Sequence, residues 1–473
     1  MWKTTDEQNA KTISYSINNG KWTEIRPSTT GVSFDVSVGD KVRFKGDNTA
    51  YGVSYSSYNT FNGSTASFNV QGNIMSLTNG DLFANATTFE SDYVFVYLFK
   101  NASIINAKNL ILPVTTLTSY CYYNMFRGCT SLTTVPELPA TTLADNCYFS
   151  MFRECTNLTS APVLPVTTLT SYCYYYMFQG CTSLTSAPEL PAETLADYCY
   201  SNMFQGCTGL TSAPVLSATT LATYCYYQMF SGCTNLKTAP ELPATTLAQS
   251  CYGGMFDGCT GLTTAPVLPA TTLTSYCYHY MFYGCTSLTS APELPVTTLA
   301  TYCYYGMFRG CTSLTSAPVL PATTLATYCY SQMFSGCTNL KTAPELPATT
   351  LARYCYYNMF YGCTNLVNSP VLPATTLARD CYGYMFQGCT SLTTAPELPA
   401  TELEKGCYVG MFQGCSSLNY IKAMFTTTPG IDYTNSWVSG VASSGTFVKN
   451  RAASWGLRGV HGIPNDWTVQ NSN

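Results

Sequence analysis

Hydrophobic and polar positions recur along most of the chain with a period of 26 residues. The motif Cys-Tyr-x-x-Met-Phe-x-Gly-Cys begins at Cys121 and returns at every 26-residue step up to Cys407, which makes twelve units. Each unit continues, with small variations, as Thr-x-Leu-Thr-x-Ala-Pro-(Glu/Val)-Leu-Pro-Ala-Thr-Thr-Leu-Ala, and Glu154 is the one departure from the motif glycine. A fixed period of about 20 to 50 residues is the signature of a stacked array, so the sequence predicts a solenoid.

Within one unit, the stretch that follows Thr194 has the spacing of an amphipathic helix. Thr194 is a candidate N-cap, and Gly206 suits the left-handed position that ends a helix. On a helical wheel, the Leu, Ala, Cys, Tyr, Met and Phe positions fall on one half and hardly change from unit to unit. The other half varies, least at the position of Tyr198. We therefore expect a helix of about three turns with a constant buried half and a variable exposed half.

The segment Leu-Thr-x-Ala-Pro-(Glu/Val)-Leu-Pro is expected to be extended, because threonine favours strands and proline is excluded from helix interiors. Its prolines keep each strand short. The expected fold class is an α/β repeat solenoid, a leucine-rich-repeat-like right-handed stack of short strands and short helices. Glu and Val alternate before the Leu-Pro from Glu137 to Glu397. Duplication of paired units and relief of repulsion between stacked carboxylates both explain this alternation.

The sequence divides into three predicted domains. Short strands at residues 13–17, 31–36 and 41–44 indicate a small β-sandwich-like domain over residues 1–94, which serves as an attachment or a cap. Residues 95–421 form the solenoid, with the twelve units preceded by a degenerate unit that lacks both cysteines. Residues 422–473 contain Trp437, Trp455 and Trp467 and are expected to cap the open end of the last repeat, because an exposed terminal strand invites aggregation.

The unit resembles a known repeat family. Met203–Pro214 reads Met-Phe-x-Gly-Cys-Thr-x-Leu-Thr-x-Ala-Pro, which is similar to the BspA-like leucine-rich repeats of bacterial surface proteins. That family carries an Ala-Phe-x-x-Cys-x-x-Leu core followed by a short strand that ends in proline. The resemblance covers about residues 95–421, although the units here are longer than is usual and the preceding Cys-Tyr is not typical. It implies adhesion and surface recognition; the array with its flanks also resembles tail-fibre or adhesin proteins of gut bacteriophages.

Composition narrows the function classes. Charged residues make up 10% of the chain and the net charge is −4, so we expect no nucleic-acid partner. The chain has two histidines, His279 and His461, and no convergent acid–base set, so we expect no catalytic residues, no metal and no cofactor. No apolar run is long enough to predict a membrane span. The first ten residues lack the apolar stretch of a secretory signal, so we expect either release by another route or a signal already removed.

The 24 cysteines fall two to a unit, eight residues apart. This spacing does not match a metal site. A disulfide within one unit is disfavoured, because eight helical residues rise about 12 Å, beyond the roughly 7 Å limit for bridged Cα atoms. Disulfides between stacked equivalents are sterically conceivable. The preferred interpretation is a ladder of buried thiols that fill space as small apolar groups.

The variable half of each unit is the candidate binding face. The two residues after Cys-Tyr, which we call the doublet, are rich in Tyr, Ser, Gly and Asn, the residues that antibody paratopes favour. The alternatives are an unconstrained solvated face, or binding of a periodic ligand such as a polysaccharide by the strand face. The candidate ligand-binding residues are Tyr123, Asn124, Phe149, Ser150, Tyr175, Tyr176, Ser201, Asn202, Tyr227, Gln228, His279, Tyr280, Tyr305, Ser331, Gln332, Tyr357, Asn358 and Tyr384.

These patterns lead to a functional hypothesis. We expect a non-enzymatic adhesion or receptor-binding solenoid, extracellular and on a bacteriophage or phage-like tail or virion surface. Its partners would be a bacterial or host surface receptor, glycan or protein, and other assembly proteins held through the N-terminal domain, with a homo-oligomer as a further possibility. The alternatives are a bacterial cell-surface adhesin that binds host matrix or mucosal protein, and a purely structural spacer or virion decoration protein.

Overall fold

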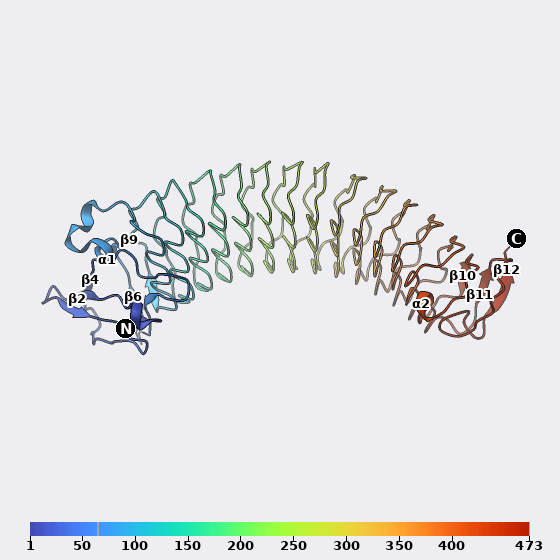
Figure 1. Ribbon diagram of the computed structural model, residues 1–473, viewed down its shortest axis with the longest axis horizontal. Helices are drawn as coiled ribbons and strands as arrows, with labels where there is room; N and C mark the ends of the chain where they lie inside the picture. Colours follow the sequence, from blue (N-terminus) through green and yellow to red (C-terminus); the bar gives the residue numbers. More distant parts are fainter. Residues whose placement is uncertain (64–65, 473) are drawn as a thin grey trace. The chain divides into compact units, whose positions relative to one another are not determined.

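The computed structural model describes residues 1–63 and 66–472. The chain divides into two compact units, Met1–Leu236 and Lys237–Asn473. Inside each unit, the repeats form successive turns of the chain that lie side by side, and we call each 26-residue turn a coil (Figure 1). The solenoid is confirmed, whereas the domain boundaries after residues 94 and 421 stay predictions.

The N-terminal residues form two small antiparallel sheets. One sheet has the order β3-β2-β4, and the other pairs β1 with β5. The ranges are β1 (Trp2–Thr4), β2 (Ile13–Ile17), β3 (Thr23–Ile25), β4 (Val42–Lys45) and β5 (Asn59–Phe61), with the 3-10 helices η1 (Glu7–Asn9) and η2 (Gly80–Asn85) and the one-turn helix α1 (Ser76–Asn79). Phe44 and Phe61 join the sheets, with 4.7 Å between ring centroids. The strand predicted at residues 31–36 is wrong: only Val32 pairs, as a single bridge to Trp2.

The degenerate unit lies against the first regular coil. The amide of Tyr97 donates to the carbonyl oxygen of Tyr123 at 2.9 Å, 26 residues further on, whereas the corresponding amides of the regular coils bond 25 residues further on, as Phe204 does to Met229. A preceding segment runs parallel to this unit through two short strand pairs. The pairs are β6 (Phe68–Asn69) with β8 (Ile104–Asn106), and β7 (Gly72–Asn73) with β9 (Leu110–Ile111).

The three-turn helix predicted for each unit does not form. The amide of Phe204 donates to the carbonyl oxygen of Met229 in the next coil at 2.9 Å, whereas the amide of Met203 turns back to Tyr200 at 3.2 Å. This alternation holds along the stretch: even positions bond to the next coil, and odd positions close a turn within their own coil. In an α-helix every amide would instead bond four residues back along the same segment. The α/β assignment is therefore wrong in its helical part.

Left-handed backbone positions repeat every fourth residue in this stretch. Tyr198, Asn202 and Gly206 have φ values of 58°, 57° and 71°, and the equivalent residues of the other coils repeat the pattern. The lateral hydrogen bonds let neighbouring coils approach closely: the rings of Phe178 and Phe204 stack 5.7 Å apart. Packed helices lie about 8–10 Å apart, so the turn-based backbone produces a denser stack than helices would.

The opposite side of each coil is extended, but its pairing is sparse. Parallel bridges join Ser186 to Ser212 and Leu190 to Leu216, one residue at a time. Proline has no amide proton to donate, so the Ala-Pro-x-Leu-Pro segment cannot form a continuous ladder. The predicted short strands are thus reduced to isolated bridges.

The core lies between the two sides of the coil. Leu195, Cys199, Tyr200, Met203 and Phe204 are buried, as the constant half predicted, and their equivalents in the other coils stack on them. Ala196, the remaining member of that half, is partly exposed. All 24 cysteines are buried thiols, in agreement with the filler interpretation.

The coil pattern extends past the last cysteine. The amide of Phe412 donates to the carbonyl oxygen of Trp437 at 2.8 Å, so Trp437 takes the place that methionine holds in other coils. Its indole nitrogen donates to Gly462 at 2.9 Å, and Trp437, Trp455 and Trp467 are all buried. The described elements here are α2 (Ile431–Thr434) and a parallel sheet of β10 (Tyr420–Ala423), β11 (Thr446–Lys449) and β12 (Thr468–Asn471).

Candidate binding surface

Five of the eighteen candidate binding residues are buried, and their assignment to an exposed face is wrong. In one example, the hydroxyl of Ser201 donates to Asn202 Oδ1 at 2.9 Å and to the carbonyl oxygen of Tyr227 at 3.3 Å. These serine and asparagine side chains are short, so the side chains of adjacent coils cover them. The buried five are Asn124, Ser150, Ser201, Asn202 and Ser331.

The other thirteen candidates are half-buried, and most are aromatic. Phe149 stacks between Tyr123 and Tyr175, at centroid distances of 4.6 Å and 4.9 Å. The half-buried thirteen are Tyr123, Phe149, Tyr175, Tyr176, Tyr227, Gln228, His279, Tyr280, Tyr305, Gln332, Tyr357, Asn358 and Tyr384.

A second aromatic column, which sequence reasoning did not single out, runs beside the doublets. We call it the outer tyrosine row. Where adjacent coils both carry tyrosine here, the rings stack nearly parallel: Tyr172 and Tyr198 lie 4.6 Å apart at 8°, and Tyr302 and Tyr328 lie 4.4 Å apart at 10°. All of its members are half-buried. They are Tyr120, Tyr172, Tyr198 and Tyr224 in the first compact unit, and Tyr276, Tyr302, Tyr328 and Tyr354 in the second.

The left-handed backbone explains part of the residue choice on this side. The outer row and the second doublet position both have positive φ, where glycine and asparagine are least strained. The Gly and Asn content of the doublets therefore has a backbone cause and is weaker support for a paratope than the sequence indicated. Tyrosine gains nothing from this backbone and is strained by about 1–2 kcal/mol. Ring stacking, worth about 0.5–1.5 kcal/mol for a pair, offsets that cost.

Polar groups accompany the aromatic rings. The guanidinium of Arg153 lies over the ring of Tyr176, 5.0 Å from its centroid, and the amide of Gln332 donates to the hydroxyl of Tyr305 at 2.7 Å. Burial raises the pKa of Tyr328 from 10.0 to about 12, so this phenol keeps its proton further into the alkaline range than a free tyrosine does. Burial lowers the pKa of His279, which keeps that ring neutral. We call the outer tyrosine row and the thirteen half-buried doublet residues together the aromatic surface.

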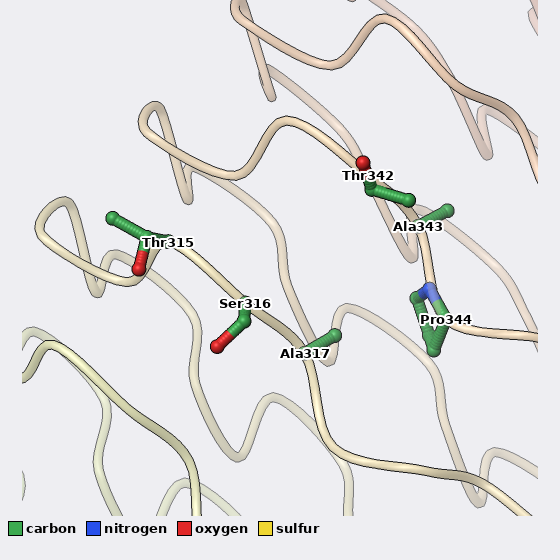
Figure 2. Close-up of a pocket in the computed structure, with 6 residues that line it drawn as sticks. All are labelled: Thr315, Ser316, Ala317, Thr342, Ala343 and Pro344. Carbon is green, nitrogen blue, oxygen red and sulfur yellow. The ribbon is translucent and has the colours of Figure 1, made fainter.

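The extended side of the array offers a different chemistry. Glu and Val alternate in an exposed column there, and Val215 is 78% exposed. One hollow of about 290 Å³ lies on this side. Figure 2 shows the residues that line it, which come from two neighbouring segments of the chain. It is lined by Thr315, Ser316, Ala317, Thr342, Ala343 and Pro344. A second hollow of about 400 Å³ lies between the Glu293 and Val319 segments. Both hollows are open and carry few polar groups that converge on one point.

Residues 1–63 and 66–472 contain no group of three or more His, Cys, Asp or Glu side chains placed to hold a metal ion. None of the helices described there has the length and hydrophobicity needed to cross a bilayer.

Comparison with known proteins identifies the repeat. The family model for the BspA-type leucine-rich repeat region, which spans six copies, matches residues 92–237, 200–341 and 301–430. These matches together cover well over half of the chain, and they coincide with the stacked coils. No curated protein and no solved structure matches the chain. The chain therefore belongs to the BspA-type leucine-rich repeat family.

Proposed function

We propose that this protein is a non-enzymatic recognition protein that binds a surface glycan or protein through its aromatic surface. The observation that carries the proposal is the outer tyrosine row. Its eight tyrosines occupy left-handed positions that glycine or asparagine would fill with less strain. The side chain is therefore retained for what it contacts, and each of the eight tyrosines remains partly accessible to solvent.

The chemistry of the aromatic surface suits adhesion. Tyrosine edges supply rigid apolar area and phenol hydroxyls, and the neighbouring Gln and Arg side chains supply hydrogen-bond donors. Stacked repeats place equivalent groups at a regular spacing, which allows many weak contacts with an extended ligand to add up. Membership of the BspA-type family supports a surface role, because the resembled repeats are those of bacterial surface proteins.

The proposed location is extracellular, on a bacteriophage or phage-like tail or virion surface, with a bacterial cell surface as the alternative. In this proposal the β-rich residues 1–94 attach the array to other assembly proteins or to further copies of the chain. The array would then carry the aromatic surface outward to a bacterial or host receptor.

A purely structural spacer is the second candidate function. The five buried doublet residues and the continuous ring stacks favour it, because packing alone accounts for those side chains. The two candidate functions make different predictions. A structural spacer should tolerate loss of the half-buried rings as long as the coils stay stacked, whereas a binding protein should lose its ligand.

The test is binding of the full chain to a panel of bacterial cells and a glycan array. The variant replaces Tyr172, Tyr198, Tyr302 and Tyr328 of the outer tyrosine row with serine, and the control replaces the exposed Val215, Val267, Val319 and Val371 with serine. We expect at least a tenfold loss of binding for the tyrosine variant only, with unchanged circular dichroism for both. Undiminished binding by the tyrosine variant would sink the aromatic-surface proposal, and loss in the valine variant alone would move the site to the extended side.

A further inference from the structure

The sulfur atoms of the motif methionines and cysteines, which are the most easily oxidised atoms of the array, are buried. The twelve motif methionines and all 24 cysteines have no exposed surface in their coils. Oxidation of sulfur follows exposure and thiolate character, and burial also raises the pKa of thiols such as Cys173, to about 12. An oxidant that reaches the folded array therefore meets phenol rings before it meets sulfur.

The accessible phenols are already arranged in pairs. In the first compact unit Tyr198 stacks on both Tyr172 and Tyr224, at 4.6 Å and 4.7 Å, with ring planes within 8° of parallel. In the second unit Tyr328 stacks on Tyr302 and Tyr354, at 4.4 Å and 4.5 Å. Each pair joins residues 26 positions apart in successive coils, so the two rings are equivalent members of neighbouring repeats.

A second tyrosine column in the same coils serves as an internal comparison. This inner tyrosine row comprises the tyrosine that follows the first motif cysteine, from Tyr122 to Tyr408. Its rings also stack, but farther apart, with 5.8 Å between Tyr174 and Tyr200, and they are buried. Of these two tyrosine columns, the outer row is the one that combines close stacking with partial solvent access.

We propose that the outer tyrosine row is an oxidative cross-linking site at which adjacent coils are joined by dityrosine bonds. The oxidant is hydrogen peroxide used by a haem peroxidase. Each of two stacked phenols loses one electron and its hydroxyl proton, and the two phenoxyl radicals couple at the ring carbons beside the oxygens. Each coupled carbon then loses its hydrogen as the ring regains its hydroxyl. Overall, two phenols and one peroxide give one dityrosine and two water molecules.

Such a bond would staple two neighbouring coils covalently. A cross-link that closes a loop restricts the unfolded chain, and the stapled coils would resist thermal unfolding. A repeat array depends on contacts between neighbours, so even one bond in each run of stacked tyrosines would hold several coils together.

The experiment treats the full-length protein with hydrogen peroxide and a haem peroxidase, then maps cross-linked peptides by mass spectrometry and records dityrosine fluorescence. We expect intrachain links between Tyr172, Tyr198 and Tyr224 and between Tyr276, Tyr302, Tyr328 and Tyr354, at a yield independent of protein concentration. The test variant changes Tyr198→Phe and Tyr328→Phe, which keeps the stacked rings but removes both central phenols. The control changes Tyr174→Phe and Tyr330→Phe in the inner row.

Loss of most dityrosine in the test variant, with little change in the control, would support the proposal. Three results would overturn it: no dityrosine in the wild-type chain, links that map to the inner row, or oxidation of the motif methionines before any tyrosine. Links mainly between chains at Tyr55, which is 64% exposed and outside the row, would also overturn it, because exposure alone would then explain the reaction.

Discussion

The thiol of Cys207 donates a hydrogen bond to the backbone carbonyl oxygen of Phe178, with 3.0 Å between sulfur and oxygen. Equivalent thiols make the same bond along the array, for example Cys337 to Phe308 at 3.1 Å. The second motif cysteine therefore fills space and also adds a second hydrogen bond to a carbonyl oxygen of the preceding coil that already accepts from the amide of Cys181 at 3.0 Å.

Replacing Cys207 with alanine should lower the free energy of unfolding by about 1–2 kcal/mol, because it removes a buried hydrogen bond and leaves a small cavity. Chemical denaturation of the single variant measures the loss. In the same preparation, a thiol-alkylating reagent should leave the native wild-type chain unlabelled and modify it fully after unfolding. Rapid labelling of the native chain would contradict the burial of these thiols.

Alkaline pH should unfold the array. Burial raises the pKa of Cys173, Cys225 and Cys355 from 9.0 to about 12 in each case. A raised folded-state pKa contributes stability that is complete below pH 9.0 and is lost as the pH rises toward about 12. Each such thiol should cost about 1.4 kcal/mol per pH unit in that window. Circular dichroism against pH should show a steep transition above pH 9, and a flat profile to pH 12 would refute this.

The left-handed glycines should resist substitution. Gly206 has a φ of 71°, so Gly206→Ala should destabilise the array by about 1 kcal/mol through backbone strain alone. Glu154→Gly is the reciprocal change, since Glu154 occupies the same position at φ 63°. It removes strain but also removes the ion pair with Arg153 at 3.1 Å, a partly exposed contact worth about 0–1 kcal/mol. Gly206→Ala should therefore lower the melting temperature, whereas Glu154→Gly should raise it or leave it nearly unchanged. Thermal unfolding of the two variants measures both effects.

Within one coil, shortening a buried apolar side chain should lower the free energy of unfolding far more than shortening an exposed one. Leu210 is fully buried, so Leu210→Ala should cost about 2–5 kcal/mol. Val215→Ala, five residues later on the exposed column, should change stability by less than about 0.5 kcal/mol. Denaturant titration of both variants provides the comparison. Equal losses would mean that the exposed column is covered in solution.

The C-terminal coil should depend on Trp437. Its ring packs on Phe412 and Phe425, with centroids 6.1 Å and 5.9 Å away. Trp437→Ala should cost about 3–5 kcal/mol locally and increase amide hydrogen exchange over residues 406–440. Trp437→Phe retains ring contact and should cost less. Unchanged exchange in the alanine variant would show that the last coil is held by other contacts.

Repeat length, register and the buried half could be predicted from the sequence, since each depends on which residue types recur at a fixed spacing. Cys199, Met203 and Cys207 stand four residues apart, as do Tyr200 and Phe204. A spacing of four was the available sign that the stretch is not a helix, because a helix repeats every 3.6 residues. Over a single short motif, a period of four residues and the helical period of 3.6 residues nearly coincide. The sequence was therefore interpreted as a helix.

The amino-acid sequence by itself determined that these copies stack and that the recurring Cys, Tyr, Met and Phe side chains are enclosed, because burial follows the recurrence of apolar residues. Only the tertiary structure decided where the backbone amides bond. The partner of the Phe204 amide lies 25 residues away in the next coil, and no local pattern reveals such a bond. The neighbouring coils also decided the accessibility of the doublets, since a serine or asparagine is buried or open according to the size of the side chains beside it.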